Sequence, residues 1–561
     1  MTDKKQADVI YFGGAIITMD DERPEVEAIA VAGGHIIATG QKEYVMRTKT
    51  DDTRLVDLEG KTLMPSFIDA HGHFMNSLQI VKWANVSGLP VGPVTQVDDI
   101  IRVLQAHVEK HGLKKGEWII GYGYDRASLA EGRDLTCDDL DPYFPDNPIM
   151  LIHVSNHGAV LNSAGFASVG MDEHTPTPPG GIILRKEGTN EPAGLIMEIA
   201  FFPIFGNMPQ PTEEEMLDTL FEAQQIYASA GVTTCQEGAT QAKDLRFLHK
   251  GAEQGLLYLD VVSLPVIFEV PALVKEYVPD FTGGLTELPD TASEPFGFYR
   301  NRLKLHGIKF LMDGSPQGKT AFWTEPLLTP GPGGEENWRG QPVFPPEIVF
   351  AALAEVYSKG IQIFCHANGD AAIDMAIEGM RAAGAKAADD RRTVIIHSQC
   401  MRPEQLDDYV ELGLSPSFFT SHCFFWGNDH LANLGERRAS FISPMASAVK
   451  AGLVCSNHTD FSVTPIDQFR PLWSSITRQM RDGRVLGPEE CIDRWNALKA
   501  LTINAAWQIF EEDRKGTIEA GKLADLVILN ANPLTVETDD LLNIKVVETL
   551  KEGVTVYPPK V

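Results

Sequence analysis

The sequence predicts an α/β protein in which a (β/α)8 TIM-like barrel carries a small β-sandwich domain built from both ends of the chain. Three observations favour this fold. The long middle of the chain alternates short apolar runs with helical patterns, which is typical of βα units. Eight of the apolar runs have the character of strands, and eight parallel strands make such a barrel. Strand-like runs also dominate the two ends of the chain.

The ends of the chain are expected to form one β-sandwich domain from residues 1–62 and 512–561. Residues 9–19 contain two apolar runs around a Gly-Gly turn, which predicts the start of a small antiparallel sheet. The run 524–529 has the same character near the other end. Two separate β appendages, one at each end, are the alternative arrangement.

The barrel is expected to occupy residues 63–511. Residues at about 75–225 exceed an ordinary connection between strands and are expected to be an insertion over the barrel mouth. The loop 313–345 is rich in glycine and proline, and its length is typical of a lid or a disordered segment. The eight candidate strands are residues 63–68, 232–235, 257–262, 308–312, 361–365, 393–396, 414–419 and 453–455.

The composition describes a folded acidic protein and argues against several classes of partner. Of 561 residues, 43% are hydrophobic and 22% are charged, which is ordinary for a globular protein. The formal net charge of -29 argues against nucleic acids and anionic membrane surfaces as partners, because phosphates select lysine and arginine. No apolar run approaches the roughly 20 residues of a membrane helix, and residues 1–8 lack the apolar core of a secretory signal.

The cysteines indicate the compartment. The seven cysteines are scattered, odd in number and form no Cys-x-x-Cys pair. Cys365 and Cys455 stand in apolar runs, where a free thiol behaves as a small hydrophobe. This usage is typical of a reducing environment, so we expect a cytoplasmic protein.

A pair of histidines follows the first candidate strand. His71 and His73 are two residues apart, so on an extended backbone both imidazoles point to one side. Gly72 between them lets the backbone turn sharply. Two imidazoles presented together suit a borderline divalent metal such as zinc. A His-x-His pair also arises by chance, so the remaining candidate ligands decide between the two interpretations.

Those other ligands stand at the ends of further candidate strands. Lys309 lies within the fourth strand, and His366 and His397 end the fifth and sixth. Asp460 follows the eighth. A single histidine at a strand end is usually only hydrogen-bonded. An ordered series at the carboxyl ends of separate strands instead indicates one site, because barrel sites form at that edge.

At these residues the chain resembles the metal-dependent amidohydrolases, in the branch called amidohydrolase family 3 or YtcJ-like. Within that branch, residues 417–422, Trp426-Gly427 and 458–460 are similar to the N-substituted formamide deformylases. The resemblance covers essentially the whole chain and rests on the segments 65–73, 231–234, 313–315, 366–370, 396–399 and 516–526.

The resemblance implies the metal and its first ligands. His71 and His73 match the ligands of the more buried ion of the family. Lys309 matches a lysine that is often carboxylated on its amine, and a carbamate, unlike an ammonium, can bridge two cations. The implied cofactor is therefore one or two divalent cations, expected to be Zn²⁺, together with a carboxylated Lys309.

The remaining ligands are implied in the same way. His366 and His397 match the ligands of a second ion. Asp460 matches an aspartate that is both a metal ligand and the proton shuttle. His458 departs from the wider branch, where a small residue is common, and it is either a substrate contact or a competing ligand.

Several residues are expected on the substrate side of the site. His157 resembles a family motif and either donates a hydrogen bond to the substrate or pins its own loop. His422 and Trp426 follow the seventh strand, so they should reach the barrel mouth. The acids Glu198, Glu237 and Asp313 are expected to support the ligands from behind.

Two aromatic pairs have two interpretations. Phe201-Phe202 and Phe424-Phe425 can line an acyl or aryl pocket, or they can belong to the core, which is the commoner role of such pairs.

The function implied is hydrolysis of a non-peptide carbon–nitrogen (amide) bond, of the EC 3.5 type. A metal-activated hydroxide attacks the carbonyl, and Asp460 passes a proton from the water to the leaving nitrogen. The expected substrate is a small molecule, an N-substituted formamide or another N-acyl amine. The alternatives are a deaminase or cyclic-amide hydrolase on the same site, and a catalytically silent regulatory protein. The family also implies a homodimer.

Overall fold

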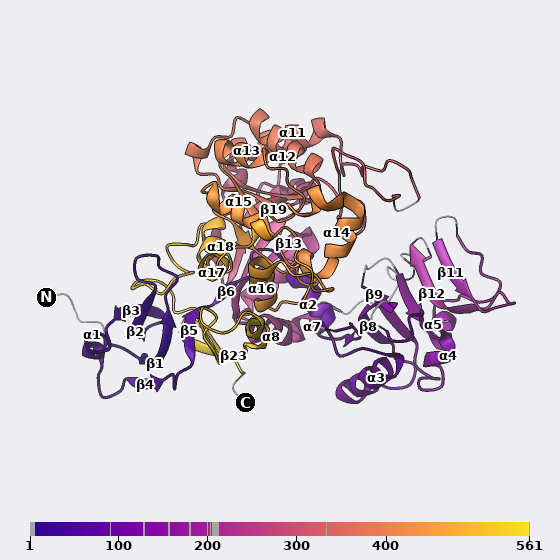
Figure 1. Ribbon diagram of the computed structural model, residues 1–561, viewed down its shortest axis with the longest axis horizontal. Coiled ribbons are helices and arrows are strands. Elements are labelled where there is room, and N and C mark those ends of the chain that lie inside the picture. The colour runs from indigo at the N-terminus through magenta and orange to yellow at the C-terminus, as the bar shows by residue number, and fades with distance from the viewer. Residues whose placement is uncertain are drawn as a thin grey trace. The chain divides into compact units, whose positions relative to one another are not determined.

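The computed structural model describes residues 6–89, 91–126, 129–154, 158–178, 181–198, 200–201, 204, 212–331 and 334–559. The chain divides into two compact units (Figure 1). One unit combines Met1–Met75 with Leu220–Val561, and the other is Asn76–Thr219. The range of the second unit overlaps the insertion expected at about 75–225, and its role as an insertion in the barrel stays a prediction. Its expected place over the barrel mouth stays a prediction.

One mixed sheet of eight strands unites the two ends of the chain. Its order in space is β24-β23-β22-β5-β1-β2-β3, and β4 pairs with β1. The β-sandwich expected for this part stays a prediction. The bounds are β1 Val9–Ile17, β2 Glu25–Ala32, β3 His35–Gly40, β4 Arg54–Asp57, β5 Thr62–Pro65, β22 Leu526–Leu529, β23 Val546–Lys551 and β24 Val554–Tyr557.

The sequence predicted an antiparallel sheet here, but the observed sheet is mixed. β1 is antiparallel to β2, and β2 to β3, but β4 and β5 both run parallel to β1. The chain leaves β3 through the short helices α1 (Lys42–Val45) and η1 (Met46–Thr48) before it returns beside β1. Such a crossover is what brings a strand back in the same direction.

The run 63–68, expected as one barrel strand, is divided at Ser66 between two sheets. Residues before it belong to β5, which pairs with β22 of the terminal sheet. Residues after it form β6 (Phe67–Ile68), which is parallel to β13 (Val232–Thr240). The amide of Ser66 still donates to Asp525 O, whereas the amide of Phe67 donates to Gly231 O. The chain therefore changes its hydrogen-bonding partner within one residue.

Two sheets with parallel central strands carry the candidate site. The first has the order β15-β16-β14-β13-β6, and the second has the order β17-β18-β19-β20-β21. Isolated parallel bridges join Val266 to Lys309 and Gly72 to Phe461. The remaining strand bounds are β14 Asp260–Pro265, β15 Phe298–Arg300, β16 Leu303–Leu305, β17 Gly307–Leu311, β18 Gln362–Ala367, β19 Thr393–His397, β20 Leu414–Phe418 and β21 Ser456–Asn457.

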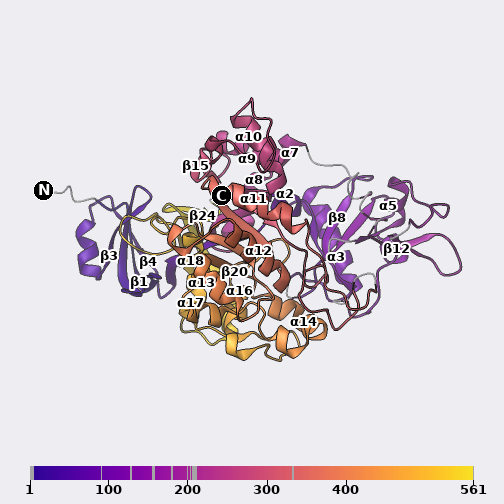
Figure 2. The ribbon, with the colours of Figure 1, turned by 90° about the horizontal axis from the view of Figure 1, so that it is seen from above.

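Helices between these strands cover them, as the βα pattern predicts. Both views show α11, α12 and α13 packed around the parallel strands (Figures 1 and 2). The helices are α8 Leu220–Ser229, α9 Ala242–Glu253, α10 Val270–Tyr277, α11 Pro346–Ser358, α12 Asp370–Ala382, α13 Gln405–Leu412, α14 His422–Ala439, α15 Met445–Lys450, α16 Phe469–Thr477, α17 Arg494–Ala500 and α18 Ile503–Gln508.

The observed strands differ from the expected ones at several places. β14 begins at Asp260 rather than residue 257, and β21 begins at Ser456, just beyond the run expected at 453–455. β16 was not expected, because Lys304 interrupts its apolar pattern. The ammonium of Lys304 is buried and donates to Glu511 Oε1 at 2.7 Å. This distant carboxylate compensates the charge that a buried strand would otherwise exclude.

A buried group of charges links the terminal sheet to β14. Oδ2 of Asp260 lies 2.5 Å from Nζ of Lys515 and 2.6 Å from Nζ of Lys551. Lys551, which ends β23, also reaches Asp525 at 2.6 Å. Burial by itself raises the pKa of Asp260, but the two ammonium groups hold it well below its usual range. These pairs therefore join three segments that are distant in sequence.

The unit Asn76–Thr219 has its own sheet and core. The sheet order is β11-β12-β10-β9-β8-β7. Ile100 and Leu104 of α3 (Val97–His111) are buried in a core with Ile119 and Leu151 from the sheet. Its strands are β7 Ala84–Asn85, β8 Ile119–Tyr124, β9 Ile149–His153, β10 Gly158–Leu161, β11 Gly181–Arg185 and β12 Pro192–Glu198, and the other helices are α4 Cys137–Leu140, α5 Ser163–Ser168 and α7 Glu213–Asp218. Across the ranges that the structure describes, no helix has both the length and the apolar composition of a membrane span.

Candidate metal centre

The His-x-His segment is held between β6 and the chain that follows β21. The amide of His73 donates to Phe461 O at 2.6 Å, and the amide of Asp460 donates to His71 O at 3.1 Å. A Cβ at Gly72 would stand 2.8 Å from Oδ2 of Asp69 and 3.3 Å from Phe461 O. Glycine therefore suits this position, since a side chain would displace the Asp69 carboxylate.

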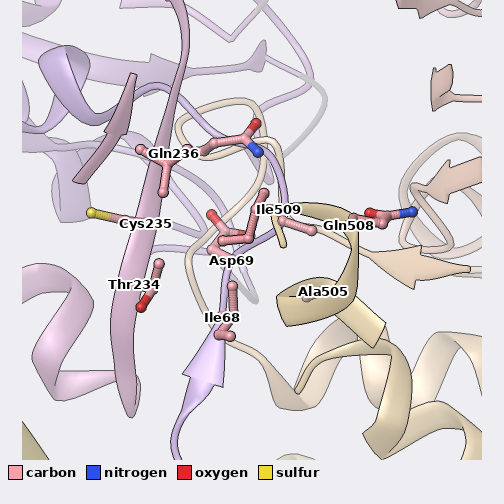
Figure 3. A pocket seen from close by; sticks show the side chains of 10 residues that line it. Ile68, Asp69, Thr234, Cys235, Gln236, Ala505, Gln508 and Ile509 are labelled. Carbon is pink, nitrogen blue, oxygen red and sulfur yellow. The ribbon is translucent and has the colours of Figure 1, made fainter. Parts of the chain in front are cut away.

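Asp69 joins the His-x-His segment to the chain after β21 through hydrogen bonds to Thr459. Its carboxylate accepts hydrogen bonds from the amide and the hydroxyl of Thr459 at 3.1 to 3.2 Å. Burial raises the pKa of Asp69 to about 7. Asp69 lines a small pocket together with residues of β13 (Figure 3). Thr234 and Gln236 lie on one face of that strand, and Cys235 lies on the other. The pocket is too narrow to hold a water molecule.

His71, His73 and Asp460 form a tight group of three potential ligands. One ligand atom from each lies within 4.8 Å of the other two. Oδ1 of Asp460 stands 3.3 Å from Nε2 of His73 and 3.6 Å from Nε2 of His71. This carboxylate oxygen is buried and faces both imidazoles.

The hydrogen bond of His71 to Gln236 determines which ring nitrogen carries the proton. Nδ1 lies 3.2 Å from the side-chain carbonyl oxygen of Gln236, which can only accept a hydrogen bond. Nδ1 therefore carries the proton, and Nε2 presents its lone pair to the group. Gln236 was not recognised in the sequence. It stands one residue before Glu237 on β13, and it lies on the same face of that strand as Thr234 (Figure 3).

Burial and the neighbouring charges shift the pKa values of these three side chains. Burial, followed by the charge of Lys309, lowers the pKa of His71 well below its ordinary value. Burial by itself lowers the pKa of His73, but the carboxylate of Asp460 reverses the effect and raises it. Burial by itself raises the pKa of Asp460, but the imidazoles of His73, His397 and His71 hold it well below its usual range. Asp460 is thus an ionised acceptor.

Lys309 reaches the same group from β17. Its Nζ lies 3.2 Å from Nε2 of His71, and the side chain is 1% exposed. Burial lowers the pKa of Lys309 to about 7. The strand that was expected to bring this lysine to the histidines does so.

His366 and His397 lie together beside this group. Nδ1 of His366 is 3.1 Å from Nε2 of His397, and the ring of His397 is 5.5 Å from that of His71. Nε2 of His366 is also 3.0 Å from Nδ2 of the Asn368 side chain. Within the described chain, these two histidines do not join the group of ligand atoms within 4.8 Å.

The backbone at the two strand ends takes an unusual conformation. His397 has φ +71° and Asp460 has φ +50°, which side chains other than glycine seldom adopt. Such residues cost about 1–3 kcal/mol each and cluster at functional sites. Both are candidate ligands, so the fold holds these two side chains in place at a local cost.

Two expected supporting acids contact the candidate ligands or their loops. Glu237 accepts from the amide of Met75 at 2.7 Å and lies 4.0 Å from Nδ1 of His73. Asp313 accepts three backbone amides, those of Asn368, Gly369 and Phe322, at 2.8 to 2.9 Å. It thereby joins the loop 313–345 to the end of β18. The side chain of Glu198, like His157 and Phe202, lies outside the described residues.

His458 and His422 form an aromatic wall next to the ligands. The ring of His458 lies 5.3 Å from that of His71 and 5.1 Å from that of His397, and both of its nitrogens lack a hydrogen-bond partner in the described chain. Phe419 separates it from His422, at ring distances of 4.9 and 4.7 Å. Trp426 lies 4.5 Å from His422. The expected substrate-side residues are therefore neighbours.

His430 is a further member of this wall that the sequence did not reveal. Its Nε2 lies 3.0 Å from Nδ1 of His422, and the two rings stack at 5.2 Å. Burial lowers the pKa of His430 to about 4. The helix is kinked at Trp426, between the two histidines, so helical periodicity in the sequence gave no signal for this contact.

Comparisons with known proteins agree with this arrangement. A model of the amidohydrolase family matches residues 54–557. The protein YtcJ of Bacillus subtilis (strain 168) is 26% identical over 98% of this chain and 99% of its own length. An N-substituted formamide deformylase of Arthrobacter pascens is 24% identical over 98% of each chain.

A solved structure shows the same fold. The crystal structure of an uncharacterized metal-dependent hydrolase from Pyrococcus furiosus matches 94% of this chain and 100% of that chain, with a TM-score of 0.71 and 22% identity. The resemblance seen in the sequence motifs is confirmed by the family match, which spans most of the chain. This chain belongs to the amidohydrolase family.

Proposed function

We propose that the chain is a metal-dependent hydrolase of a non-peptide carbon–nitrogen bond, acting on an N-substituted formamide or another N-acyl amine. The observation that carries this proposal is the group of two imidazole nitrogens and one buried carboxylate oxygen within 4.8 Å. Three electron-pair donors directed at one point repel one another unless a cation lies between them. The donor set therefore fits a divalent metal, and imidazole with carboxylate suits zinc.

The proposed architecture is a closed (β/α)8 barrel formed by β6, β13, β14 and β17–β21. Eight parallel strands are available in that order. The isolated bridges from Val266 to Lys309 and from Gly72 to Phe461 support contact at the two junctions between the sheets. The candidate ligands lie within or shortly after five of these strands, β6, β17, β18, β19 and β21. Barrel enzymes carry their active sites at the carboxyl ends of the strands.

His71, His73 and Asp460 would hold the first ion, and Lys309, His366 and His397 would complete a two-ion site. A divalent cation bound there would act as a Lewis acid and would lower the pKa of its bound water from 15.7 to about 7. Lys309 would serve as a ligand in its carboxylated form. Its lowered pKa supports this role, because the unprotonated amine is the form that combines with carbon dioxide.

Asp460 is the proposed proton carrier. Its carboxylate accepts a proton from water as the water oxygen bonds to the amide carbon. It then delivers that proton to the nitrogen as the carbon–nitrogen bond breaks, so water and amide become a carboxylic acid and an amine. Proton transfer of this kind contributes about 10²–10⁴-fold to the rate. His458, His422 and Trp426 would form the wall against which the substrate lies.

The test is amine release from a matched panel of N-formyl, N-acetyl and longer N-acyl benzylamines. The full chain is purified with added zinc and bicarbonate, and chelator-treated protein serves as the control. We expect release that depends on metal, with the formyl member preferred. No release from any member by metal-loaded protein would overturn the amide substrate. Ammonia released from a nucleobase panel by the same protein would instead support deamination.

A further inference from the structure

A row of aromatic rings leads from the candidate metal centre to the surface. The ring of His458 is followed by Phe419 at 4.9 Å and by Trp426 a further 6.3 Å away. Phe425 lies 5.6 Å from Trp426, and Phe424 lies 5.2 Å from Phe425. The first two residues are buried and the last three are half-buried. The row is therefore one wall that becomes accessible at its outer end.

Two arginines cover that outer end. Cζ of Arg470 lies 4.4 Å from the ring centre of Phe424, and Cζ of Arg481 lies 5.4 Å from that of Phe425. Arg481 is also 5.8 Å from Phe424, so both cations share one ring. A guanidinium within about 6 Å of a ring is attracted by the ring's quadrupole. The aromatic wall thus orients both side chains.

Neither guanidinium has an anionic partner within the part of the chain described. No carboxylate oxygen lies within 4.0 Å of either, and neither donates a hydrogen bond to a described residue. Asp467 and Asp429 act on Arg470 and Arg481 only from a distance. Burial lowers the pKa of Arg470, which reflects the cost of leaving this cation without a partner.

The two arginines lie side by side in a chain of formal net charge -29. Arg484, three residues after Arg481, is by contrast paired with Asp482 at 2.8 Å. Two adjacent cations without acids repel each other and favour an incoming anion.

The two arginines stand at the same edge as Asp460. Phe424 and Phe425 lie in the first turns of α14, which follows β20, and Arg470 lies in the first turn of α16, which follows β21 and Asp460. Met480, next to Arg481, packs against Gly427 of α14, where a Cβ would lie 2.5 Å from its Cγ. Both cations are thus tied to the carboxyl ends of neighbouring parallel strands.

We infer that Arg470 and Arg481 form a carboxylate subsite, so that the preferred amide carries a flat aromatic body with a carboxylate remote from the scissile bond. This inference rests on the proposed function and names its substrate class. The aromatic wall stacks on the body of the substrate, and the two guanidinium groups bind the carboxylate with paired hydrogen bonds. Lysine would supply charge but not the planar fork.

The experiment compares two substrates that differ only in the carboxylate, N-formylbenzylamine and 4-(formamidomethyl)benzoate. The wild-type protein should hydrolyse the carboxylated member with the higher kcat/KM. Arg470→Met and Arg481→Met should each lower kcat/KM for that member by about 10- to 100-fold, which corresponds to the loss of a charge-assisted hydrogen-bonded pair. Both should leave the neutral member within about threefold of wild type, a change of roughly 0.7 kcal/mol.

Methionine retains an apolar stem over Phe424, so the wall is preserved in these variants. Arg470→Lys keeps the charge and should recover only part of the preference. Arg484→Met is the matched control, because Arg484 lies three residues from Arg481 and is already paired with Asp482. Equal losses on both substrates, or a wild-type protein without preference for the carboxylate, would overturn the subsite.

A binding measurement separates failure of the subsite from failure of the proposed function. Calorimetric titration of the metal-loaded full chain with each compound needs no turnover. Tighter binding of the carboxylated compound that Arg470→Met abolishes would support the subsite even if neither amide is hydrolysed. Equal affinity for both compounds in wild type and variant would reject it, whatever the activity.

Discussion

Nζ of Lys309 lies 3.2 Å from Nε2 of His71, the nitrogen that carries the lone pair. Both side chains are buried, and no carboxylate of the described chain forms an ion pair with the lysine. A buried ammonium without such a partner is costly, and burial accordingly lowers the pKa of Lys309 to about 7. The fold thus places a partly unprotonated amine where a metal ligand is expected.

We therefore expect Lys309 to be carboxylated in the metal-loaded protein. Protein loaded with zinc and ¹³C-bicarbonate should show one carbamate signal by NMR, and Lys309→Gln should remove it. Lys304 is the internal control, since it is equally buried but paired with Glu511 and should remain an amine. A plain amine at Lys309 in a high-resolution map with full metal occupancy would exclude the modification.

Asp460→Asn should abolish turnover while the fold and much of the metal binding persist. The amide keeps an oxygen near His73 and His71 but cannot carry a proton, so kcat should fall by about 10²–10⁴-fold. The measurements are kcat and bound metal by elemental analysis. Asp482→Asn, a change at an exposed acid, should leave both unchanged. A kcat near that of the wild type would remove Asp460 from the role of proton carrier.

Acid should destabilise the protein partly through His430. Burial lowers its pKa to about 4 in the folded state, whereas an unfolded histidine titrates near 6.5. Between these values the unfolded state binds the extra proton, so the stabilising contribution is complete above about pH 6.5 and declines as the pH falls toward 4.

One pKa unit corresponds to about 1.4 kcal/mol, so the free energy of unfolding should lose roughly 2 kcal/mol from His430 between pH 6.5 and 5. Urea unfolding of the wild type and of His430→Asn at several pH values measures the difference in slope. His174→Asn, a change at an exposed histidine, is the control. Equal pH slopes for wild type and His430→Asn would show that His430 titrates normally in the fold.

Asp260→Ala should destabilise the junction between the terminal sheet and β14. The change leaves the buried ammonium groups of Lys515 and Lys551 without their shared carboxylate. Removing one partner of a buried ion pair costs about 3–5 kcal/mol. Urea unfolding should report this loss, whereas Asp482→Ala should leave the midpoint nearly unchanged. A midpoint for Asp260→Ala equal to that of the wild type would mean that the lysines find other partners.

Local patterns were enough to predict the order of elements and most of the candidate ligands. Apolar runs bounded by turns mark strands wherever both faces are buried, so β17, β18 and β19 lie where they were expected. His366 and His397 could be placed at strand ends because the end of an apolar run is visible in the local sequence. The motifs then led to the family.

Other features depended on contacts between distant segments. Ser66 divides an unbroken apolar run between two sheets because Asp525 and Gly231 supply different partners. β16 forms around Lys304 because Glu511, more than 200 residues away, satisfies its charge.

In the candidate site, too, some features were visible in the local sequence and others depended on tertiary contacts. Sequence motifs identified His71, His73 and Asp460, since their chemistry and strand-end positions are local. Tertiary structure alone placed Gln236 on His71, His430 on His422, and Arg470 with Arg481 over one aromatic wall. These pairings join residues on different elements or turns, and no periodicity in a single segment encodes which side chains will meet.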